Sequence, residues 1–372
     1  MKICSFCVMD ETDPGILFDH AGRCNRCRDA EDLGKKIWFP TDYGKHLLDE
    51  IVESVIDQGR GSEYDCLIGL SGGIDSAYLA YRLRTDYPSL RILAVHVDGG
   101  WNSEIAVKNI ELLVKALEID LHTEVIDWLE MRDLQLSFMK ASVKNQDIPQ
   151  DHAFFASIYH LAAKHRIRTF FSGGNFATEC ILPPEWGHSA LDAKHLRAIH
   201  RRYGKMPKLS RYPTVSFWQL YFWYPVIKQF RVVRPLNLMR YSRSDAKILL
   251  KNALGWSDYG GKHHESRFTK FFQTFYLPSK FSIDKRKAHL SSMIVSGQMT
   301  RDIALSILST SPYDMNQLHD DIFFISKKIG VSVLEFEKLL AVRPADHGDF
   351  PTSKLFYRFK DVVKKLVQLK AK

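Results

Sequence analysis

The chain has 372 residues, enough for one large domain or for two to three smaller ones with sizeable cores. Its hydrophobic content of 45% and charged content of 26% are ordinary for a soluble globular protein. The formal net charge of +9 favours anionic partners, such as nucleotides, phosphosugars, RNA or an acidic membrane surface, and composition does not choose among them. Because acids and cysteines occupy the first residues, MKICSFCVMDETDPG, where a signal peptide has its apolar core, we expect a cytoplasmic protein.

Four of the six cysteines form two C-x2-C pairs near the N-terminus, CSFC and CNRC, separated by sixteen residues. Two such knuckles can present four thiolates at the corners of a tetrahedron, which is typical of a closed structural zinc site. Two disulfides or an iron–sulfur cluster are the alternatives, and zinc is the favoured interpretation. The expected ligands are Cys4, Cys7, Cys24 and Cys27.

Beyond the knuckles, residues 33–62 have the pattern of a helical connector, and strand and helix patterns then alternate. Strand patterns cover 65–70, 91–97, 121–126, 168–172 and, less regularly, 230–236, while helical patterns cover 76–86, 103–118, 128–143 and 152–165. This alternation predicts an α/β fold with a doubly wound parallel sheet. From residue 243 onward the patterns are helical, including 354–370. The expected organisation is a zinc-binding segment (1–32), the connector (33–62), an α/β domain (63–242) and a helical substrate region (243–372).

The most apolar stretch is residues 214–227, TVSFWQLYFWYPVI. It is shorter than the roughly 20 apolar residues of a membrane-spanning helix, and Gln219 and Pro225 interrupt it, so we expect no membrane span. We expect its aromatic side chains to lie in the buried core, in preference to forming a docking face for a partner.

The sequence SGGIDS, residues 71–76, stands between the strand at 65–70 and the helix that follows. In a parallel α/β sheet this position binds ligands, and glycines followed by a helix N-terminus suit an anion. The chain contains no G-x4-G-K-[ST] and no G-x-G-x-x-G, which argues against a Walker A loop and a dinucleotide site. A carboxylate beside phosphate requires a metal, so Asp75 is assigned to Mg²⁺, with helix capping as the alternative. The expected phosphate-binding residues are Ser71, Gly72, Gly73, Asp75 and Ser76.

SGGIDS resembles the pyrophosphate loop of the PP-loop ATPases, a HUP-like group that contains GMP synthetase, asparagine synthetase and tRNA thiolases. The resemblance implies that ATP is cleaved between its α and β phosphates and that AMP is attached to a carbonyl oxygen. It also implies that adenine is held at Val97 and Asp98, after the second strand. A second glycine turn, SGGN, would then approach the α phosphate through Gly173, Gly174 and Asn175, unless it is a turn without a ligand.

Several further motifs resemble the N-acetyl sugar amidotransferases of the WbpG and PseA type, which act in surface-polysaccharide and flagellin-glycan biosynthesis. They are the N-terminal knuckles, HVDGGWNSEIAVKNI, PQDHA, SGGNFATE, GGKHHESRFT and KFSIDKRKAHLSSMIVSGQMTRDIAL, covering Cys4 to about Leu305. The resemblance implies conversion of an acetamido group into an acetamidino group. In lipopolysaccharide O-antigen pathways the implied substrate is a UDP-linked diacetamido uronic acid.

This chemistry assigns roles to charged residues near the glycine turns. Cations would stabilise the departing pyrophosphate together with Mg²⁺, and a carboxylate would accept a proton from attacking ammonia. Consecutive residues of HHES do not converge on one metal, so His263 and Glu265 are expected to position ammonia or the sugar. Asp151 is equally suited to capping a helix, and residues 284–287 to starting one in solvent. The expected catalytic residues are Asp75, Asp151, Glu179, Lys262, His263, Glu265, Lys285 and Arg286.

No glutaminase context surrounds Cys66 or Cys180, and Cys4 is assigned to zinc. We therefore expect separate proteins to supply ammonia, and the resemblance implies a HisH- and HisF-like pair, a glutaminase and a cyclase-like protein. Nucleic acid is not an expected partner. One rival is a tRNA thiolase with Cys180 as sulfur carrier, and another is a non-catalytic zinc module that binds RNA or a partner.

Overall fold

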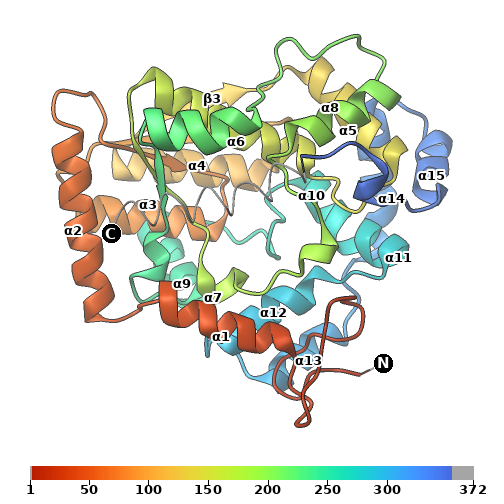
Figure 1. Ribbon diagram of the computed structural model, residues 1–372, viewed down its shortest axis with the longest axis horizontal. Coiled ribbons are helices and arrows are strands. Elements are labelled where there is room, and N and C mark those ends of the chain that lie inside the picture. Colours follow the sequence, from red (N-terminus) through yellow and green to blue (C-terminus); the bar gives the residue numbers. More distant parts are fainter. Residues whose placement is uncertain (1, 354–372) are drawn as a thin grey trace.

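The computed structural model describes residues 2–353 and contains one five-stranded sheet (Figure 1). All pairings are parallel, in the order β3-β2-β1-β4-β5, with Cys66 of β1 opposite both Ile92 and Thr169. All five strands expected from the sequence are confirmed. The fifth, whose pattern is less regular, lies at the edge of the sheet. The strands are β1 (Cys66–Gly69), β2 (Ile92–Asp98), β3 (Asp120–Val125), β4 (Thr169–Phe171) and β5 (Arg231–Val233).

Helices cover both faces of this sheet. Cys66 and Ile68 point to a face packed with α2 (Asp42–Gln58), α3 (Ile74–Asp86), α4 (Glu104–Leu117) and α9 (Arg243–Leu254). Leu67 points to the opposite face, which carries α6 (Ile148–Lys164) and the π-helix η2 (Gln219–Ile227). Since alternate residues of β1 are buried on opposite faces, the expected doubly wound α/β architecture is confirmed.

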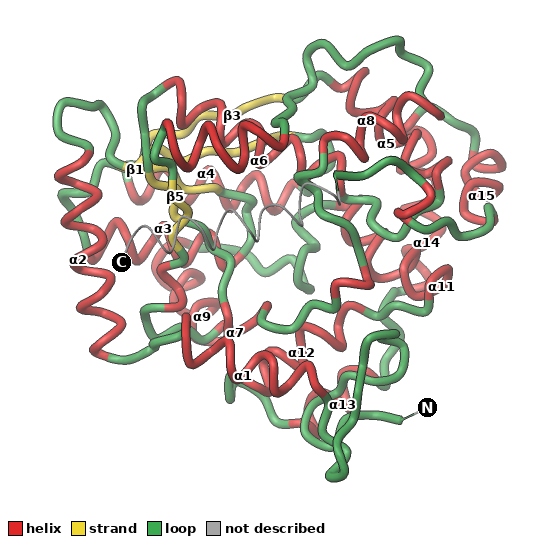
Figure 2. The backbone as a smooth tube through the Cα atoms, viewed as in Figure 1, coloured by secondary structure: helices red, strands yellow, loops and turns green. Residues whose placement is uncertain are grey.

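A second, mostly helical body lies beside the sheet, to the right and below in Figure 1, whereas the strands gather at the upper left in Figure 2. Its core joins the N-terminal segment to α5 (Trp128–Ala141), α8 (Ala193–Tyr203) and the C-terminal helices. The latter are α10 (Arg267–Phe271), η4 (Phe272–Tyr276), α11 (Leu277–Phe281), α12 (Lys285–Val295), α13 (Arg301–Leu308), α14 (Met315–Ile329) and α15 (Val333–Ala341). Short turns are α7 (Phe176–Glu179), η1 (Pro184–Trp186), η3 (Pro235–Asn237) and η5 (His347–Asp349).

Helix α1 (Asn25–Ile37) links the N-terminal segment to the connector, and the helical region that follows the sheet begins with α9 at Arg243. The helix expected at 354–370 falls outside the described residues. No helix among residues 2–353 combines the length and apolar character that a membrane crossing requires.

The burial expected for residues 214–227 is wrong for part of the stretch. Val215, Leu220 and Tyr224 are buried against α6, whereas Phe222 and Trp223 are 51% and 45% exposed. Most of the stretch forms the π-helix η2 at the edge of the fold. Only one side of this helix packs against other described residues.

Two buried carboxylates of α5 fix the loop that follows α8. Asp133 accepts hydrogen bonds from the amides of Lys205 (2.9 Å) and Met206 (3.0 Å), and its Oδ2 lies 3.0 Å from His200 Nε2. Glu130 accepts from the amides of residues 210, 211 and 212. Burial alone would raise the pKa of Asp133, but these amides and His200 hold it below its ordinary value.

We expect Asp133→Asn to lower the free energy of unfolding by about 1–3 kcal/mol at pH 7, because buried amides lose a charged acceptor. A carboxyl with a lowered folded pKa stabilises above its unfolded pKa and loses that contribution as the pH falls through its folded pKa. The difference from wild type should therefore shrink below about pH 4. Urea unfolding at pH 7 and below about pH 4 measures this difference in the free energy of unfolding. The exposed Asp32→Asn is a control that should change it little. An equal difference at both pH values would contradict this account.

Candidate active site

A cavity of about 740 Å³ lies beyond the carboxyl ends of β1, β2 and β4. The glycine loop 71–76, the second glycine turn 172–175, the start of α6, and the segments 259–273 and 285–289 line it. Several expected residues meet here, from distant parts of the chain. They are Ser71, Gly73, Asp75, Ser76, Val97, Asp151, Gly173, Gly174, Asn175, Glu179, Lys262, His263, Glu265 and Lys285.

The glycine loop is held by its own hydroxyls. Ser71 Oγ accepts from Gly73 N (3.2 Å), and Ser76 Oγ donates to the Gly73 carbonyl (3.1 Å). Gly72 has φ +81°, and a Cβ there would lie 2.7 Å from the Ala106 carbonyl, so glycine is required. Helix α3 begins at Ile74 without a side-chain cap, so the capping role considered for Asp75 is not the one seen. The loop thus presents backbone N–H groups and a helix N-terminus to the cavity.

The second glycine turn packs directly on this loop. A Cβ at Gly173 would lie 3.0 Å from Ser76 N and 3.1 Å from the Asp75 carbonyl carbon. Asn175 caps α7 by accepting from Thr178 N (3.0 Å), and its amide donates to the Gly173 carbonyl (3.2 Å). The two turns therefore form one continuous polar floor.

Lys262 connects the two turns. Its Nζ lies 2.9 Å from Glu179 Oε1 and 3.7 Å from Asp75 Oδ2, and it donates to Thr178 Oγ1 (2.8 Å). Asp75 Oδ1 also accepts from the Tyr241 hydroxyl. Burial alone would raise the pKa of Glu179, but the Lys262 ammonium holds it below its ordinary value. Glu179 is therefore ionised in the lining of the cavity.

Glu265 supplies a second carboxylate beside the glycine loop. A Cβ at Gly73 would lie 3.3 Å from Glu265 Oε1, while Oε2 is buried with no hydrogen-bond partner. Burial opposes ionisation, but the neighbouring His263, 3.7 Å away, lowers the pKa of Glu265. An ionised oxygen without a donor fits a metal ligand, so Asp75 and Glu265 could hold Mg²⁺ against phosphate oxygens.

A second group of titratable side chains lines the cavity from the start of α6 and from α12. Burial raises the pKa of Asp147, and burial together with Asp147 raises the pKa of Asp151 to about 7. Asp151 is open to the cavity although it lies deep within the protein, so solvent inside the cavity reaches it. Burial lowers the pKa of Lys285, partly offset by Asp147 and Asp151. Burial also lowers the pKa of His289, which is neutral there.

Some expected residues lie elsewhere. Arg286 does not line the cavity, because its guanidinium binds Asp284 (2.7 Å) and the carbonyls of Ile307 and Thr310. Asp98 is not among the lining residues either, since it accepts from Gly100 N (2.8 Å) and Asn102 (3.0 Å). Gly72 does not line the cavity either, and its positive φ sets the shape of the glycine loop.

Sequence reasoning missed other lining residues, namely Asp147, Arg234, Arg243, Tyr259 and His289. Arg234 directly follows β5, so the rule that ligands lie beyond strand ends could have indicated it. Tyr259, whose hydroxyl accepts from Ile74 N (3.1 Å), carries no motif that would have singled it out.

Comparison with known families gives one match in the C-terminal part of the chain. Residues 265–366 match the family described as "LPS biosynthesis protein WbpG-like, C-terminal domain". We call residues 265–366 the WbpG-like domain. The match confirms the resemblance drawn from short motifs for this part of the chain and extends it beyond Leu305. The matched segment supplies Glu265, Thr269, Gln273, Lys285 and His289 to the cavity.

Among solved structures, the NH3-dependent NAD synthetase of Campylobacter jejuni is 14% identical, with a TM-score of 0.30 over 69% of this chain and 97% of that one. The U34-tRNA thiolase NcsA of Methanococcus maripaludis, with its [4Fe-4S] cluster, is 15% identical, with a TM-score of 0.31 over 85% and 91%. A 4-thiouridine synthetase–RNA complex with bound ATP is 16% identical, with a TM-score of 0.31 over 73% and 54%. Scores this low carry no inference for this chain. Comparison with curated proteins gives no match.

The four expected metal ligands meet in one buried cluster that docks on the WbpG-like domain. The Sγ atoms of Cys4 and Cys27 are 3.9 Å apart, those of Cys7 and Cys24 3.7 Å, and those of Cys24 and Cys27 3.5 Å. Bonds of about 2.3 Å to a tetrahedral ion place sulfurs about 3.8 Å apart. In a four-iron cluster each thiolate binds a different iron, so the sulfurs stand farther apart. Arg301 of α13 donates to the carbonyls of Cys4 (3.0 Å) and Cys7 (3.1 Å).

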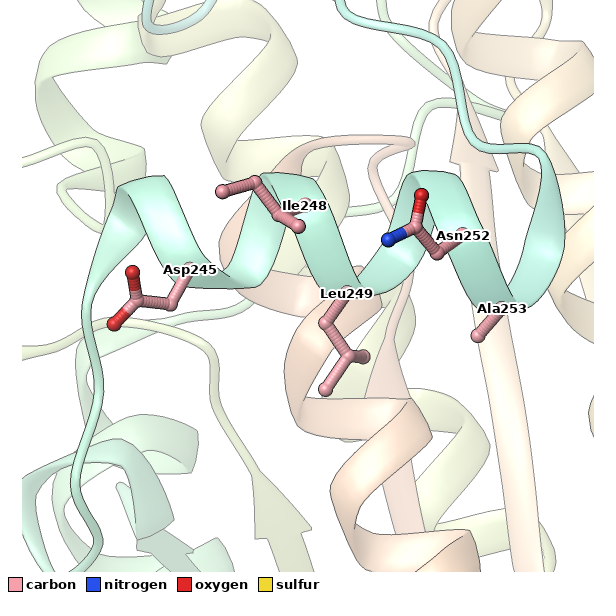
Figure 3. Close-up of a pocket in the computed structure, with 5 residues that line it drawn as sticks. All are labelled: Asp245, Ile248, Leu249, Asn252 and Ala253. Carbon is pink, nitrogen blue, oxygen red and sulfur yellow. The ribbon is translucent and has the colours of Figure 1, made fainter.

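A separate hollow lies on α9 alone (Figure 3). It is lined by Asp245, Ile248, Leu249, Asn252 and Ala253, all from one helix. It brings together no group of charges and no glycine turn, so it has no bearing on the chemistry of the cavity.

We expect Cys24→Ser to remove the bound metal and to lower Tm by roughly 5 °C or more, because the knuckles have little core of their own. Cys180→Ser, which alters a thiol outside the cluster, should retain about one zinc per chain. Metal analysis and thermal unfolding of the purified proteins measure both. Iron with acid-labile sulfide in the wild-type protein would contradict the zinc assignment.

Proposed function

We propose that this chain is an ATP-dependent ligase that converts the acetamido group of a nucleotide-linked N-acetyl sugar into an acetamidino group. The carbonyl oxygen attacks the α phosphorus of ATP, pyrophosphate leaves, and an O-adenylated imidate forms. Ammonia then adds to the imidate carbon, and the C–O bond breaks to release AMP. The observation that carries this proposal is a single cavity lined both by the glycine loop 71–76, which resembles a PP-loop, and by the WbpG-like domain.

The nucleotide end of the cavity supports the first step. The loop 71–76 would offer N–H groups to the β and γ phosphates, and the adjoining turn 172–175 would then approach the α phosphate. Lys262 lies between the turns, where charge develops as pyrophosphate departs. Mg²⁺, when bound, would neutralise phosphate charge, with Asp75 and Glu265 as its protein ligands.

The carboxyl group of Asp151 supports the second step. Attack by ammonia produces a cationic centre that must lose a proton before AMP departs. Asp151, with its pKa raised to about 7, exchanges protons near neutrality, as a general base requires. His289, whose Nδ1 lies 3.3 Å from the Thr178 carbonyl oxygen, is uncharged and does not repel the developing cation. We assign proton acceptance to Asp151 and leave Glu179 paired with Lys262.

Ammonia is proposed to come from a separate glutaminase. Burial raises the pKa of Cys180 to about 11, and Cys66 is fully buried in β1. Neither thiol is suited to act as a nucleophile, because the thiolate is the reactive form. The same chemistry disfavours the sulfur-carrier role that a tRNA thiolase would give to Cys180.

Heavy-oxygen transfer tests the proposal. With an acetamido-¹⁸O nucleotide sugar, ATP, Mg²⁺ and ammonium, we expect one labelled oxygen in AMP and an amidine product by mass spectrometry. Glutamine in place of ammonium should give no amidine with the pure chain. The Gly173→Ala variant, which forces the two turns apart, should reduce AMP formation at least about tenfold. ADP formation, or AMP without label, would overturn the proposal.

The pH dependence tests the role of Asp151. With hydroxylamine, which is already unprotonated near neutrality, the rate of the second step should rise as the pH passes through about 7, because the base must be ionised. Asp151→Asn should remove this rise and slow the step by about 10²–10⁴-fold. Glu179→Gln should keep the rise. Single-turnover assays over pH 5 to 9, roughly the range spanned by such a base, separate the cases, and an unchanged profile for Asp151→Asn would exclude it as the base.

A further inference from the structure

Residues 193–244 contain twelve Lys and Arg side chains and no Asp or Glu. The cations of α8 and the loop after it are exposed, and Lys194, Arg201 and Lys208 form no ion pair with a described residue. The cavity does not account for this concentration of positive charge, because only Arg234 and Arg243 of the twelve side chains line it. The exposed cations of the first part are Lys194, Arg197, Arg201, Arg202, Lys205, Lys208 and Arg211.

The same segment continues into the partly exposed helix η2. Besides Phe222 and Trp223, Val226 is 52% and Ile227 is 50% exposed. The buried side of η2 is anchored on α6, where the Tyr159 and Tyr224 rings lie 4.6 Å apart. Four large apolar side chains within six residues therefore face solvent, next to a cation-rich loop.

Two contacts make these parts one surface. Arg197 of α8 donates to Thr214 Oγ1 (2.8 Å), and Val215 N donates to His152 Nε2 of α6 (3.2 Å). Since α8 and η2 both pack on α6, they follow one another along the same outer layer. In Figure 1 the green segment from α8 runs along the upper edge of the molecule. We name residues 194–211 and 222–227 the basic–aromatic face.

The backbone of this face is fixed from below. Glu130 and Asp133 bind the amides of residues 205, 206 and 210–212, so the loop cannot turn its cations inward to meet these carboxylates. Arg211 pairs with Asp127 and the Arg202 guanidinium lies over the Phe350 ring, whereas Lys194, Arg201, Lys205 and Lys208 are exposed. The fixed backbone beneath them reduces the ordering that binding to a flat anionic surface would require.

We propose that the basic–aromatic face docks this protein on an anionic lipid bilayer. Cations near such a surface each contribute attraction, and aromatic and aliphatic side chains beside them suit the depth of the headgroup boundary. Val226 and Ile227 decide against RNA, because aliphatic side chains offer no stacking surface to bases. A second copy is disfavoured because it would bring the same positive charge against this face. The proposal does not depend on the reaction in the cavity.

Flotation of the full chain with lipid vesicles tests this inference. We expect binding to phosphatidylglycerol–phosphatidylcholine vesicles, none to phosphatidylcholine alone, and loss at high salt. Lys205→Glu with Lys208→Glu should lower the partition coefficient at least about tenfold. Phe222→Ser with Trp223→Ser should also lower it while leaving the salt dependence. The matched control, Lys108→Glu with Lys115→Glu, makes the same charge change on α4, across the sheet, and should bind nearly as wild type. Thermal unfolding confirms that each variant is folded.

Three results would overturn the inference. They are absence of vesicle binding, an equal loss of vesicle binding in the α4 control, and salt-dependent binding to single-stranded RNA with none to vesicles. A change from dimer to monomer in the face variants, by sedimentation velocity, would assign the face to a second copy. Vesicle binding that appears only after removal of residues 354–372 would mean that the chain's own C-terminus, and not a bilayer, occupies the basic–aromatic face.

Discussion

The contact between the two glycine turns determines where every other group of the cavity can stand. A Cβ at Gly173 would lie 3.0 Å from Ser76 N, tighter than an ordinary contact, and one at Gly72 would lie 2.7 Å from the Ala106 carbonyl of α4. These contacts bring the carboxyl ends of β1 and β4 into one floor. A phosphate chain crossing that floor can touch both turns at once, which two separate loops on neighbouring strands would not permit.

The opposite wall comes from residues far away in the chain, and buried polar contacts hold it. Lys262 joins Asp75 to Glu179, while Thr269 Oγ1 donates to Asp147 (3.1 Å) across to α6. The N-terminal segment with the four clustered cysteines takes part through α12, where Val8 N donates to Ser291 Oγ (3.2 Å) and Lys287 pairs with Asp10. Because α12 also carries Lys285 and His289, the cysteine cluster supports the wall that bears them. Its contribution to the cavity is therefore positional.

Local patterns predicted the parts of this arrangement that depend on short segments. Alternating strands and helices gave the sheet, and glycines at the ends of β1 and β4 gave the floor, because the ends of parallel strands meet at one edge. The same reasoning failed for Arg286, whose neighbour Asp284 captures the guanidinium, a competition that a charge run does not reveal. It failed for Phe222 and Trp223 because hydrophobicity indicates which side chains gain from burial and not whether a partner surface remains for them. Asp147 and His289 were missed because only tertiary packing places them together.

Charge is distributed unevenly along the cavity, and this distribution gives it a direction. Near the glycine loop, Asp75 and Glu265 bring together two carboxyl groups that suit a metal and the phosphates it would bind, with Lys262 between the turns. Around the start of α6 and on α12, burial raises the pKa of Asp147 and Asp151 and lowers the pKa of Lys285 and His289. All four groups are thereby shifted toward their neutral forms. In the proposed reaction, the fixed charges near the glycine loop would stabilise departing pyrophosphate, whereas Asp151 would exchange protons near neutrality without holding ammonium too tightly to react. Since both groups line one cavity, an activated carbonyl could be attacked by ammonia without leaving the protein.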